Sequence, residues 1–156
     1  MELMSKKMTR DFAVTILNWK YDSPYDLYNN EVCDESINEL MYGGYRAVVD
    51  REDALIGFYC TGPSAQVPAG RGAGMYPGQA IDIGLGMKPE ITGNGYGYTF
   101  FTFVLKELEG REQIHMFRLT VAAFNKRAIK LYEKMGFSIE RRFSSETNEF
   151  ITMVKR

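Results

Sequence analysis

Residues 92–97, which read Thr-Gly-Asn-Gly-Tyr-Gly, form a glycine-rich segment between a predicted strand and a predicted helix. Backbone N–H groups at a helix N-terminus lack intrahelical partners and carry the positive end of the helix dipole, so they bind anions. Two phosphate-binding fingerprints do not match. No Gly-Lys-Ser/Thr opens the helix as a P-loop requires, and Gly93, Gly95 and Gly97 miss the spacing of the dinucleotide fingerprint. Spacing alone leaves a structural turn and a phosphate cradle equally open.

The predicted strand before this turn carries one acidic residue. Side chains alternate along a strand, so the apolar odd-numbered residues from Ile81 to Met87 share one face. Asp82, Gly84 and Gly86 share the other face. Because glycine inside a strand often marks the close approach of another backbone or a ligand, this face predicts such an approach.

Histidine and cysteine offer little catalytic chemistry in this chain. There is one histidine, His115, and the two cysteines, Cys33 and Cys60, are far apart in sequence. A single histidine excludes His-rich metal sites, and no Gly-x-Ser-x-Gly elbow supports a serine triad. We therefore expect no bound metal, no disulfide and a structural role for His115.

Composition is typical of a globular protein of one domain. The chain has 156 residues, of which 45% are hydrophobic and 25% charged, with a formal net charge of −1. This balance lacks the excess of basic residues that binding to nucleic-acid phosphates needs. No apolar run has membrane-spanning length, and no apolar stretch of a secretory signal follows the first lysines. We expect a cytoplasmic protein that binds neither nucleic acid nor membrane.

The elements that must position these residues alternate between strands and helices. Periodicity and turn residues predict strands over residues 12–19, 45–50, 54–61, 80–87, 118–124, 137–143 and 150–154. Helices are predicted over residues 24–30, 34–41, 96–109 and 126–135, the last with Asn125 as its N-cap. Residues 62–78 are rich in glycine and proline and predict a long, functional or flexible loop. The order predicts one mixed α/β domain over residues 1–156.

Two segments together resemble the GNAT superfamily of N-acetyltransferases. Residues 80–97 resemble its acyl-CoA motif, in which an acid-bearing strand and a proline precede Gln/Arg-x-x-Gly-x-Gly/Ala at the start of a helix. Residues 119–137 resemble the next motif, with Tyr132 and Gly136 at the family's spacing. Thr92 stands where the family has Gln or Arg, a position that chiefly contributes backbone. The resemblance implies a central, mostly antiparallel, twisted sheet of about seven strands flanked by about four helices.

The resemblance also implies acetyl-CoA as co-substrate. Backbone amides of the glycine-rich turn would hold the pyrophosphate, and the backbones of Leu85 and Met87 would pair with the pantetheine amides as an added strand does. The glycine face of this strand would leave room for that approach. Asn125 would contact the cofactor arm or only cap its helix, and Lys134 would reach the nucleotide phosphate or only face solvent. The residues predicted to bind the cofactor are Leu85, Met87, Thr92, Gly93, Asn94, Gly95, Tyr96, Gly97, Asn125 and Lys134.

In the reaction that the resemblance implies, a neutral amine attacks the acetyl thioester directly within a ternary complex. Tyr132 would protonate the thiolate leaving group, unless its hydroxyl is buried and bonded elsewhere. Asp82 would be the general base, directly or through water, if partial burial makes its carboxylate basic enough. The alternative for Asp82 is a structural hydrogen-bond acceptor.

The acceptor would be a primary amine on a small molecule or on a peptide. Six acidic residues and no Lys or Arg lie between Tyr21 and Tyr45, and acidic residues from this region would wall the acceptor cleft of the resembled fold. Negative charge attracts cationic amines, although a solvated acidic surface explains the same pattern. The alternative function is a non-catalytic module that holds acyl-CoA as a sensor. Exposed C-terminal strands could pair between subunits and so form a homodimer.

Overall fold

The computed structural model describes residues 2–110 and 116–156, and His115 therefore lies outside the described residues. The strands are β1 (Leu3–Lys7), β2 (Tyr45–Asp50), β3 (Leu55–Thr61), β4 (Ile81–Met87), β5 (Phe117–Ala122), β6 (Ser138–Ser144) and β7 (Glu149–Lys155). The α-helices are α1 (Arg10–Leu17), α2 (Asp34–Tyr42), α3 (Pro68–Gly72), α4 (Tyr96–Glu109) and α5 (Lys126–Lys134). Short 3-10 helices are η1 (Tyr25–Tyr28), η2 (Gly62–Ala65) and η3 (Pro89–Ile91).

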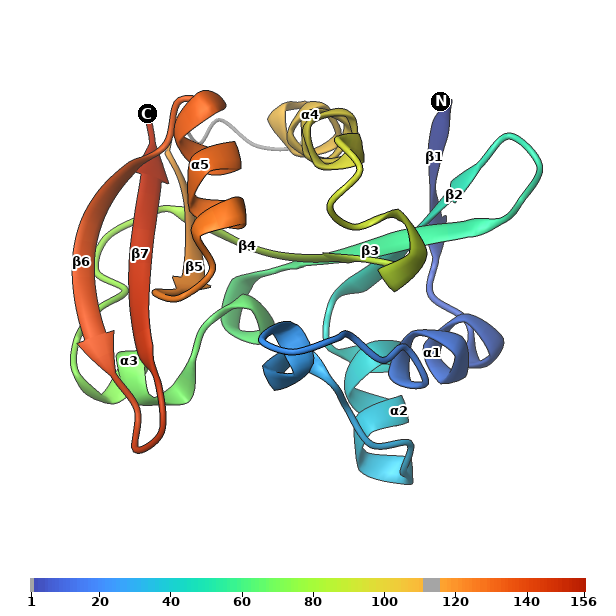
Figure 1. Ribbon diagram of the computed structural model, residues 1–156, viewed down its shortest axis with the longest axis horizontal. Coiled ribbons are helices and arrows are strands. Elements are labelled where there is room, and N and C mark those ends of the chain that lie inside the picture. The colour runs from blue at the N-terminus through green and yellow to red at the C-terminus, as the bar shows by residue number, and fades with distance from the viewer. Residues whose placement is uncertain (1, 111–115) are drawn as a thin grey trace. The chain divides into compact units, whose positions relative to one another are not determined.

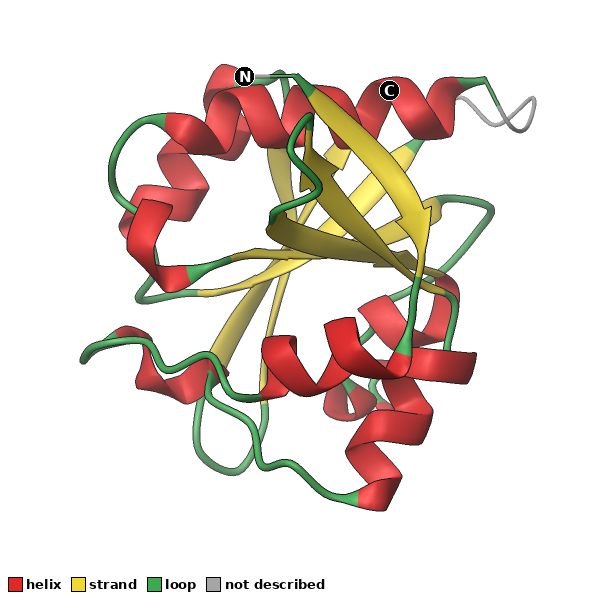
Figure 2. Ribbon diagram, turned by 90° about the vertical axis from the view of Figure 1, so that its right-hand side faces the viewer, coloured by secondary structure: helices red, strands yellow, loops and turns green. Residues whose placement is uncertain are grey.

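The seven strands form one sheet in the order β1-β2-β3-β4-β5-β7-β6 (Figures 1 and 2). β4 and β5 are parallel, whereas the β1–β2, β2–β3, β5–β7 and β6–β7 pairs are antiparallel. The predicted mixed fold with a mostly antiparallel sheet is confirmed. The chain divides into two compact units, one made of Met1–Cys60 with Leu85–Phe103 and the other of Thr61–Gly84 with Val104–Arg156. β4 and α4 therefore contribute residues to both units.

The prediction of a strand over residues 12–19 is wrong, because most of this segment lies in helix α1. Thr9 caps the helix, and its hydroxyl accepts a hydrogen bond from the backbone N–H of Phe12 at 3.1 Å. Ala13, Ile16 and Leu17 are buried at the i, i+3, i+4 spacing of a helix face. The β-branched and aromatic residues favoured a strand locally, but burial of this face in the core outweighs that propensity.

The sheet instead begins with β1, which no hydrophobic pattern predicts. β1 pairs with β2 from Leu3 opposite Asp50 to Lys7 opposite Arg46. Its residues are half-buried or exposed, as at the edge of a sheet. Lysines such as Lys6 and Lys7 at the end of β1 are typical of an edge strand, because their charge discourages pairing with a further strand.

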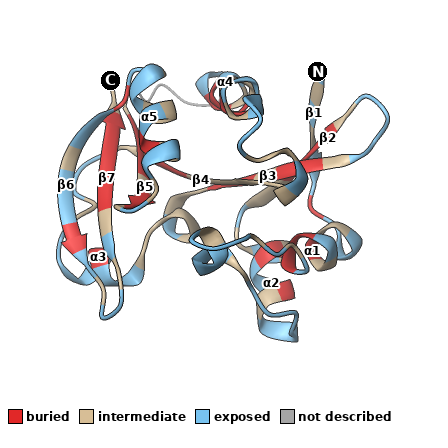
Figure 3. Ribbon diagram, viewed as in Figure 1, coloured by how far each residue is buried: buried red, intermediate tan, exposed pale blue. Residues whose placement is uncertain are grey.

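The C-terminal strands are found within a few residues of their predicted bounds. β5 and β7 are largely buried, whereas β6 is largely exposed and lies at the edge of the sheet (Figure 3). β7 is enclosed between β5 and β6. Of the two strands predicted to be free for pairing between subunits, only β6 therefore has an open edge.

Residues 62–78, predicted as a loop, contain the short helices η2 and α3. A proline lies at the start of each helix, where it fixes φ and its missing N–H costs no intrahelical bond. This segment packs closely on β6, since a Cβ at Gly70 would lie 2.8 Å from the ring of Phe143 and 2.9 Å from the ring of Tyr76. The segment is therefore ordered by packing.

Candidate active site

The glycine-rich turn leads into α4, whose first residue is Tyr96. Gly93 and Gly95 have φ angles of +77° and +83°, a region that other residues rarely adopt. The Asn94 side chain donates to the carbonyls of Glu90 and Thr92, both at 3.3 Å. These bonds occupy carbonyl oxygens, whereas N–H groups in the first turn of a helix are in general not used by intrahelical bonds. The turn therefore has the backbone conformation that the predicted anion cradle requires.

Thr92 stabilises this turn from its N-terminal side. Its hydroxyl donates to the Pro89 carbonyl at 2.8 Å, and its backbone N–H donates to the same oxygen at 3.2 Å. The side chain thus closes the η3 turn at the position where the family has Gln or Arg. Thr92 is therefore a local structural residue whose backbone leads into the cradle.

The backbone groups of Leu85 and Met87 point away from β3. Lys88 N–H donates to Ile56 on β3, so the even-numbered residues of β4 face that strand. Ile81 N–H donates to Met116 beside β5, so the odd-numbered residues face the other way. The β4–β5 register runs only from Ile81 opposite Phe117 to Ile83 opposite Leu119, and both strands continue beyond it. Leu85 and Met87 thus extend a hydrogen-bonding edge past the end of this ladder.

The glycine face of this strand, made of Gly84 and Gly86, was expected to leave room for the cofactor. At Gly86 the protein itself fills that room. A Cβ built at Gly86 would lie 2.5 Å from the Phe58 ring, and one built at Gly57 would meet the Gly86 carbonyl. The missing side chains therefore allow β3 and the Phe58 ring to approach β4. The backbone edge of β4, not this face, is what a ligand could use.

Helix α5 carries the other residues predicted for the cofactor and for catalysis. Asn125 caps it, with its side-chain oxygen accepting from the Ala128 N–H at 3.1 Å. The capping alternative for Asn125 thus accounts for its side-chain oxygen. Tyr132 is half-buried, with its ring centroid 6.3 Å from that of Phe137, and Lys134 is exposed in the last turn. The exposed lysine near the helix C-terminus also has a favourable interaction with the helix dipole.

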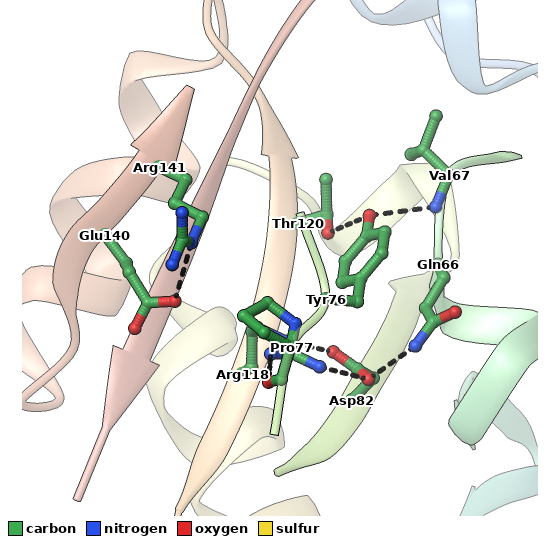
Figure 4. Close-up of polar contacts among 9 residues, drawn as sticks. All are labelled: Gln66, Val67, Tyr76, Pro77, Asp82, Arg118, Thr120, Glu140 and Arg141. Atoms are coloured by element: carbon green, nitrogen blue, oxygen red, sulfur yellow. Dashed lines mark hydrogen bonds and ion pairs between the residues drawn. The ribbon is translucent and has the colours of Figure 1, made fainter. Parts of the chain in front are cut away.

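Asp82 is 5% exposed and is held by a buried arginine (Figure 4). Arg118 Nε donates to one carboxylate oxygen at 2.6 Å and Nη2 donates to the other at 2.9 Å. Gln66 Nε2 donates to the second oxygen at 2.8 Å. Hydrogen bonds to Asp82 raise the pKa of Arg118, which keeps the guanidinium charged. These contacts favour the structural-acceptor interpretation of Asp82 over the general base.

Arg118 extends this network into the 62–78 segment. Its Nη1 donates to the Pro77 carbonyl at 2.8 Å, and its guanidinium carbon lies 5.1 Å from the centre of the Tyr76 ring. The Tyr76 hydroxyl accepts from the Val67 N–H at 2.9 Å and is bonded to the Thr120 hydroxyl at 2.7 Å. Sequence reasoning did not identify Arg118 as important. The sequence feature that could have identified Arg118 is that it is the one charged residue in the largely apolar strand β5.

The six acidic residues between Tyr21 and Tyr45 are exposed, as a charged surface requires. They are Asp22, Asp26, Glu31, Asp34, Glu35 and Glu39. Asp34 and Glu35 lie in the first turn of α2, where a negative charge also stabilises the helix dipole. Asp22, Asp26 and Glu31 lie outside that helix, and the dipole does not account for them.

The described residues offer neither a cluster of metal ligands nor a membrane-spanning helix. No group of three or more His, Cys, Asp or Glu side chains is placed to hold a metal ion among the residues described. Within the same ranges, no helix combines the length and apolar character needed to cross a membrane.

The fold and the glycine-rich turn match a known family. Residues 11–137 match the model of the acetyltransferase (GNAT) family, and the chain belongs to that family. It is an N-acetyltransferase enzyme, which is the class that the two sequence motifs predicted. Members of this family generally use acetyl-CoA as co-substrate. No curated protein matches the sequence.

Solved structures share the fold at low sequence identity. A chimera of the spermidine N-acetyltransferase SpeG from Vibrio cholerae and hSSAT has a TM-score of 0.75 at 20% identity, with 99% of this chain and 95% of that chain covered. A GNAT-family acetyltransferase from Bacillus anthracis has a TM-score of 0.73 at 17% identity, covering 99% and 94%. Mutant forms of the spermidine/spermine N-acetyltransferase SpeG from Vibrio cholerae reach 0.68 at 21% identity, covering 98% and 93%.

The buried ion pair gives the first prediction. Asp82→Asn or Arg118→Gln should each lower the free energy of unfolding by about 3–5 kcal/mol, because each leaves its buried partner without the opposite charge. Urea denaturation followed by circular dichroism measures this change. Lys6→Gln is the control, since it removes an ion pair with Asp53 whose side chains are 46% and 70% exposed. The free energy of unfolding of that variant should differ from the wild-type value by less than about 1 kcal/mol. An Asp82→Asn protein with full stability but no turnover would restore the general-base interpretation.

Proposed function

We propose that this enzyme transfers an acetyl group from acetyl-CoA to a primary amine by direct attack within a ternary complex. The observation that carries the proposal is the positive-φ glycine turn at the start of α4, which follows a strand whose backbone edge continues at Leu85 and Met87 beyond the β4–β5 ladder. The family match spans residues of both compact units, which supports residues 1–156 acting as one catalytic domain. It also favours an enzyme over a non-catalytic acyl-CoA sensor.

The donor would be held mainly by main-chain atoms. N–H groups of Gly93 to Gly97 would bind the pyrophosphate, aided by the dipole of a helix of 14 residues. Leu85 and Met87 would exchange backbone hydrogen bonds with the pantetheine amides, as an added strand does. Exposed Lys134 would contribute charge to the nucleotide phosphate. None of these contacts depends on a side chain at Thr92.

Matched glycine substitutions test this cradle. Gly95→Ala should weaken acetyl-CoA binding at least about tenfold, because a non-glycine residue resists φ near +83° and the N–H groups would turn away. Gly74→Ala is the control, since Gly74 has a φ of +72° and, like Gly95, has nothing within 4 Å of an added Cβ. It carries the same backbone strain but lies outside the cradle. Calorimetric titration with acetyl-CoA and then CoA measures both.

Wild-type protein should bind acetyl-CoA and CoA with micromolar dissociation constants. If both glycine variants weaken acetyl-CoA binding equally, backbone strain and not the cradle causes the loss of affinity. No detectable binding by the wild type would overturn the proposed donor altogether.

Tyr132 is our candidate for the general acid. In the proposed step the cationic amine first gives one proton to water, and the neutral nitrogen then attacks the thioester carbonyl carbon. The C–N bond forms and the C–S bond breaks. The leaving thiolate takes the phenolic proton of Tyr132, and the second proton of the amine returns to the phenolate through solvent. Half-burial of Tyr132 on α5 allows both contact with a ligand and exchange with water. With Asp82 engaged by Arg118, water is the first acceptor of the amine proton.

Removing the phenolic hydroxyl tests this role. Tyr132→Phe should lower kcat at least tenfold, because the thiolate would leave unprotonated. The dissociation constant for acetyl-CoA and the unfolding midpoint should stay within error of wild type, since the ring is retained. Steady-state release of CoA, detected with a thiol reagent, measures kcat. Unchanged kcat would remove Tyr132 from the mechanism.

The acceptor is proposed to be a cationic amine. The exposed acids Asp26 and Glu31 lie in a segment without basic residues and attract positive charge. Several structures of similar fold are spermidine N-acetyltransferases, which supports a polyamine as the first candidate. The amino group of a peptide is the second candidate, because the same charge would attract it.

Charge removal tests the acceptor class. The double variant Asp26→Asn/Glu31→Gln should raise KM for spermidine several-fold with little change in kcat, since only long-range attraction is lost. The double variant Glu52→Gln/Glu109→Gln removes the same charge from exposed positions outside this segment and should leave KM unchanged. Equal effects of the two variants would show that net charge, not this segment, sets acceptor affinity.

A further inference from the structure

Residues 20–30 form a loop, here called the 20–30 loop, between α1 and α2. Its ends are held together, because Lys20 Nζ donates to the Asn30 carbonyl at 2.7 Å and the Tyr21 N–H donates to Asn29 Oδ1 at 2.7 Å. The 3-10 helix η1 lies between these ends. The loop carries exposed Asp22 and Asp26. These contacts join loop residues to one another and give the loop a defined shape.

The Tyr21 side chain connects this loop to β4. Its hydroxyl donates to the Met87 carbonyl at 2.7 Å, across 66 positions of sequence. Both residues belong to the same compact unit. Met87 is the last residue of β4, and its carbonyl belongs to the backbone edge that points away from β3. A side chain of the 20–30 loop therefore occupies a position on the strand edge that precedes the anion cradle.

The surroundings of Tyr21 keep this hydroxyl a donor. Burial, and secondarily the charge of Glu90, raise its pKa to about 12. The phenol is therefore protonated throughout the physiological pH range. Glu90 lies in η3, between Met87 and the glycine-rich turn. Tyr21 thus bonds to the end of β4 and lies within electrostatic range of the segment that follows it.

We propose that Tyr21 is a positioning residue, whose hydroxyl fixes the 20–30 loop and its acidic side chains to the end of β4. This inference rests on the proposed function, in which β4 binds pantetheine and the loop's acids attract the amine. Met87 retains its N–H for the cofactor, since Tyr21 bonds only the carbonyl, and a carbonyl oxygen has a second lone pair. One hydroxyl would then connect the acceptor segment with the strand that carries the donor.

A kinetic comparison of Tyr21→Phe with wild type tests the positioning role. The variant keeps the ring and loses the hydrogen bond, so KM for spermidine should rise about fivefold, as expected for one lost net hydrogen bond. The dissociation constant for acetyl-CoA should change less than twofold, because the backbone edge remains. Tyr42→Phe is the matched control, since Tyr42 is 81% exposed at the end of α2. It should match wild type in both constants.

Hydrogen exchange tests the anchor without any turnover. In ligand-free Tyr21→Phe, the amides of Tyr21, Tyr25 and Asn29, which are hydrogen-bonded within the loop, should exchange about fivefold faster. Amides of β2 should be unaffected, and Tyr42→Phe should match wild type. Unchanged loop exchange would overturn the proposal whatever the kinetics show.

The two measurements together separate this inference from the proposed function. Faster loop exchange with unchanged spermidine KM would overturn the positioning role, because the anchor would exist without affecting the acceptor. Wild-type protein that fails to bind acetyl-CoA would overturn the proposed function, while the exchange data would still decide whether Tyr21 holds the loop. Faster exchange with raised spermidine KM and unchanged acetyl-CoA affinity would support the proposal.

Discussion

A buried ion pair fixes the alignment of the two parallel strands. Asp82 and Arg118 are directly opposite in the β4–β5 register, and each is almost inaccessible to water. A buried charge without its partner costs several kcal/mol, so registers that separate these residues are strongly disfavoured. The same guanidinium donates to the Pro77 carbonyl and lies over the Tyr76 ring. The alignment of β4 and the position of the 62–78 segment therefore depend on one interaction.

This pair also changes how a conspicuous acid should be interpreted. From sequence, a lone carboxylate on a glycine-bearing strand suggested a base. In the structure three donor atoms from Arg118 and Gln66 bond to it, so both of its oxygens already have structural partners. A residue at a motif position can thus serve the site by holding strands in place.

Much of the fold followed from local patterns, and the exceptions have physical causes. Helices α2, α4 and α5 and most strands were predicted because caps, turn residues and periodicity agreed there. Residues of α1 carry strand-like side chains, and only burial of Ala13, Ile16 and Leu17 made them helical. β1 is held by pairing with β2, which no local pattern encodes. Arg118 was overlooked because its importance comes from a partner 36 positions away.

In the candidate site, too, some features follow from local sequence and others depend on residues far apart in the chain. The glycines were enough to predict a tight turn before α4, since φ angles near +80° at Gly93 and Gly95 need that residue type. The Tyr21–Met87 contact joins residues far apart in sequence and is visible only in three dimensions.

A protein with a net charge of −1 can bind a polyanionic donor if main-chain N–H groups and a helix dipole supply the attraction. Its acidic side chains are then free to attract a cation, so donor and acceptor need not compete for the same charges.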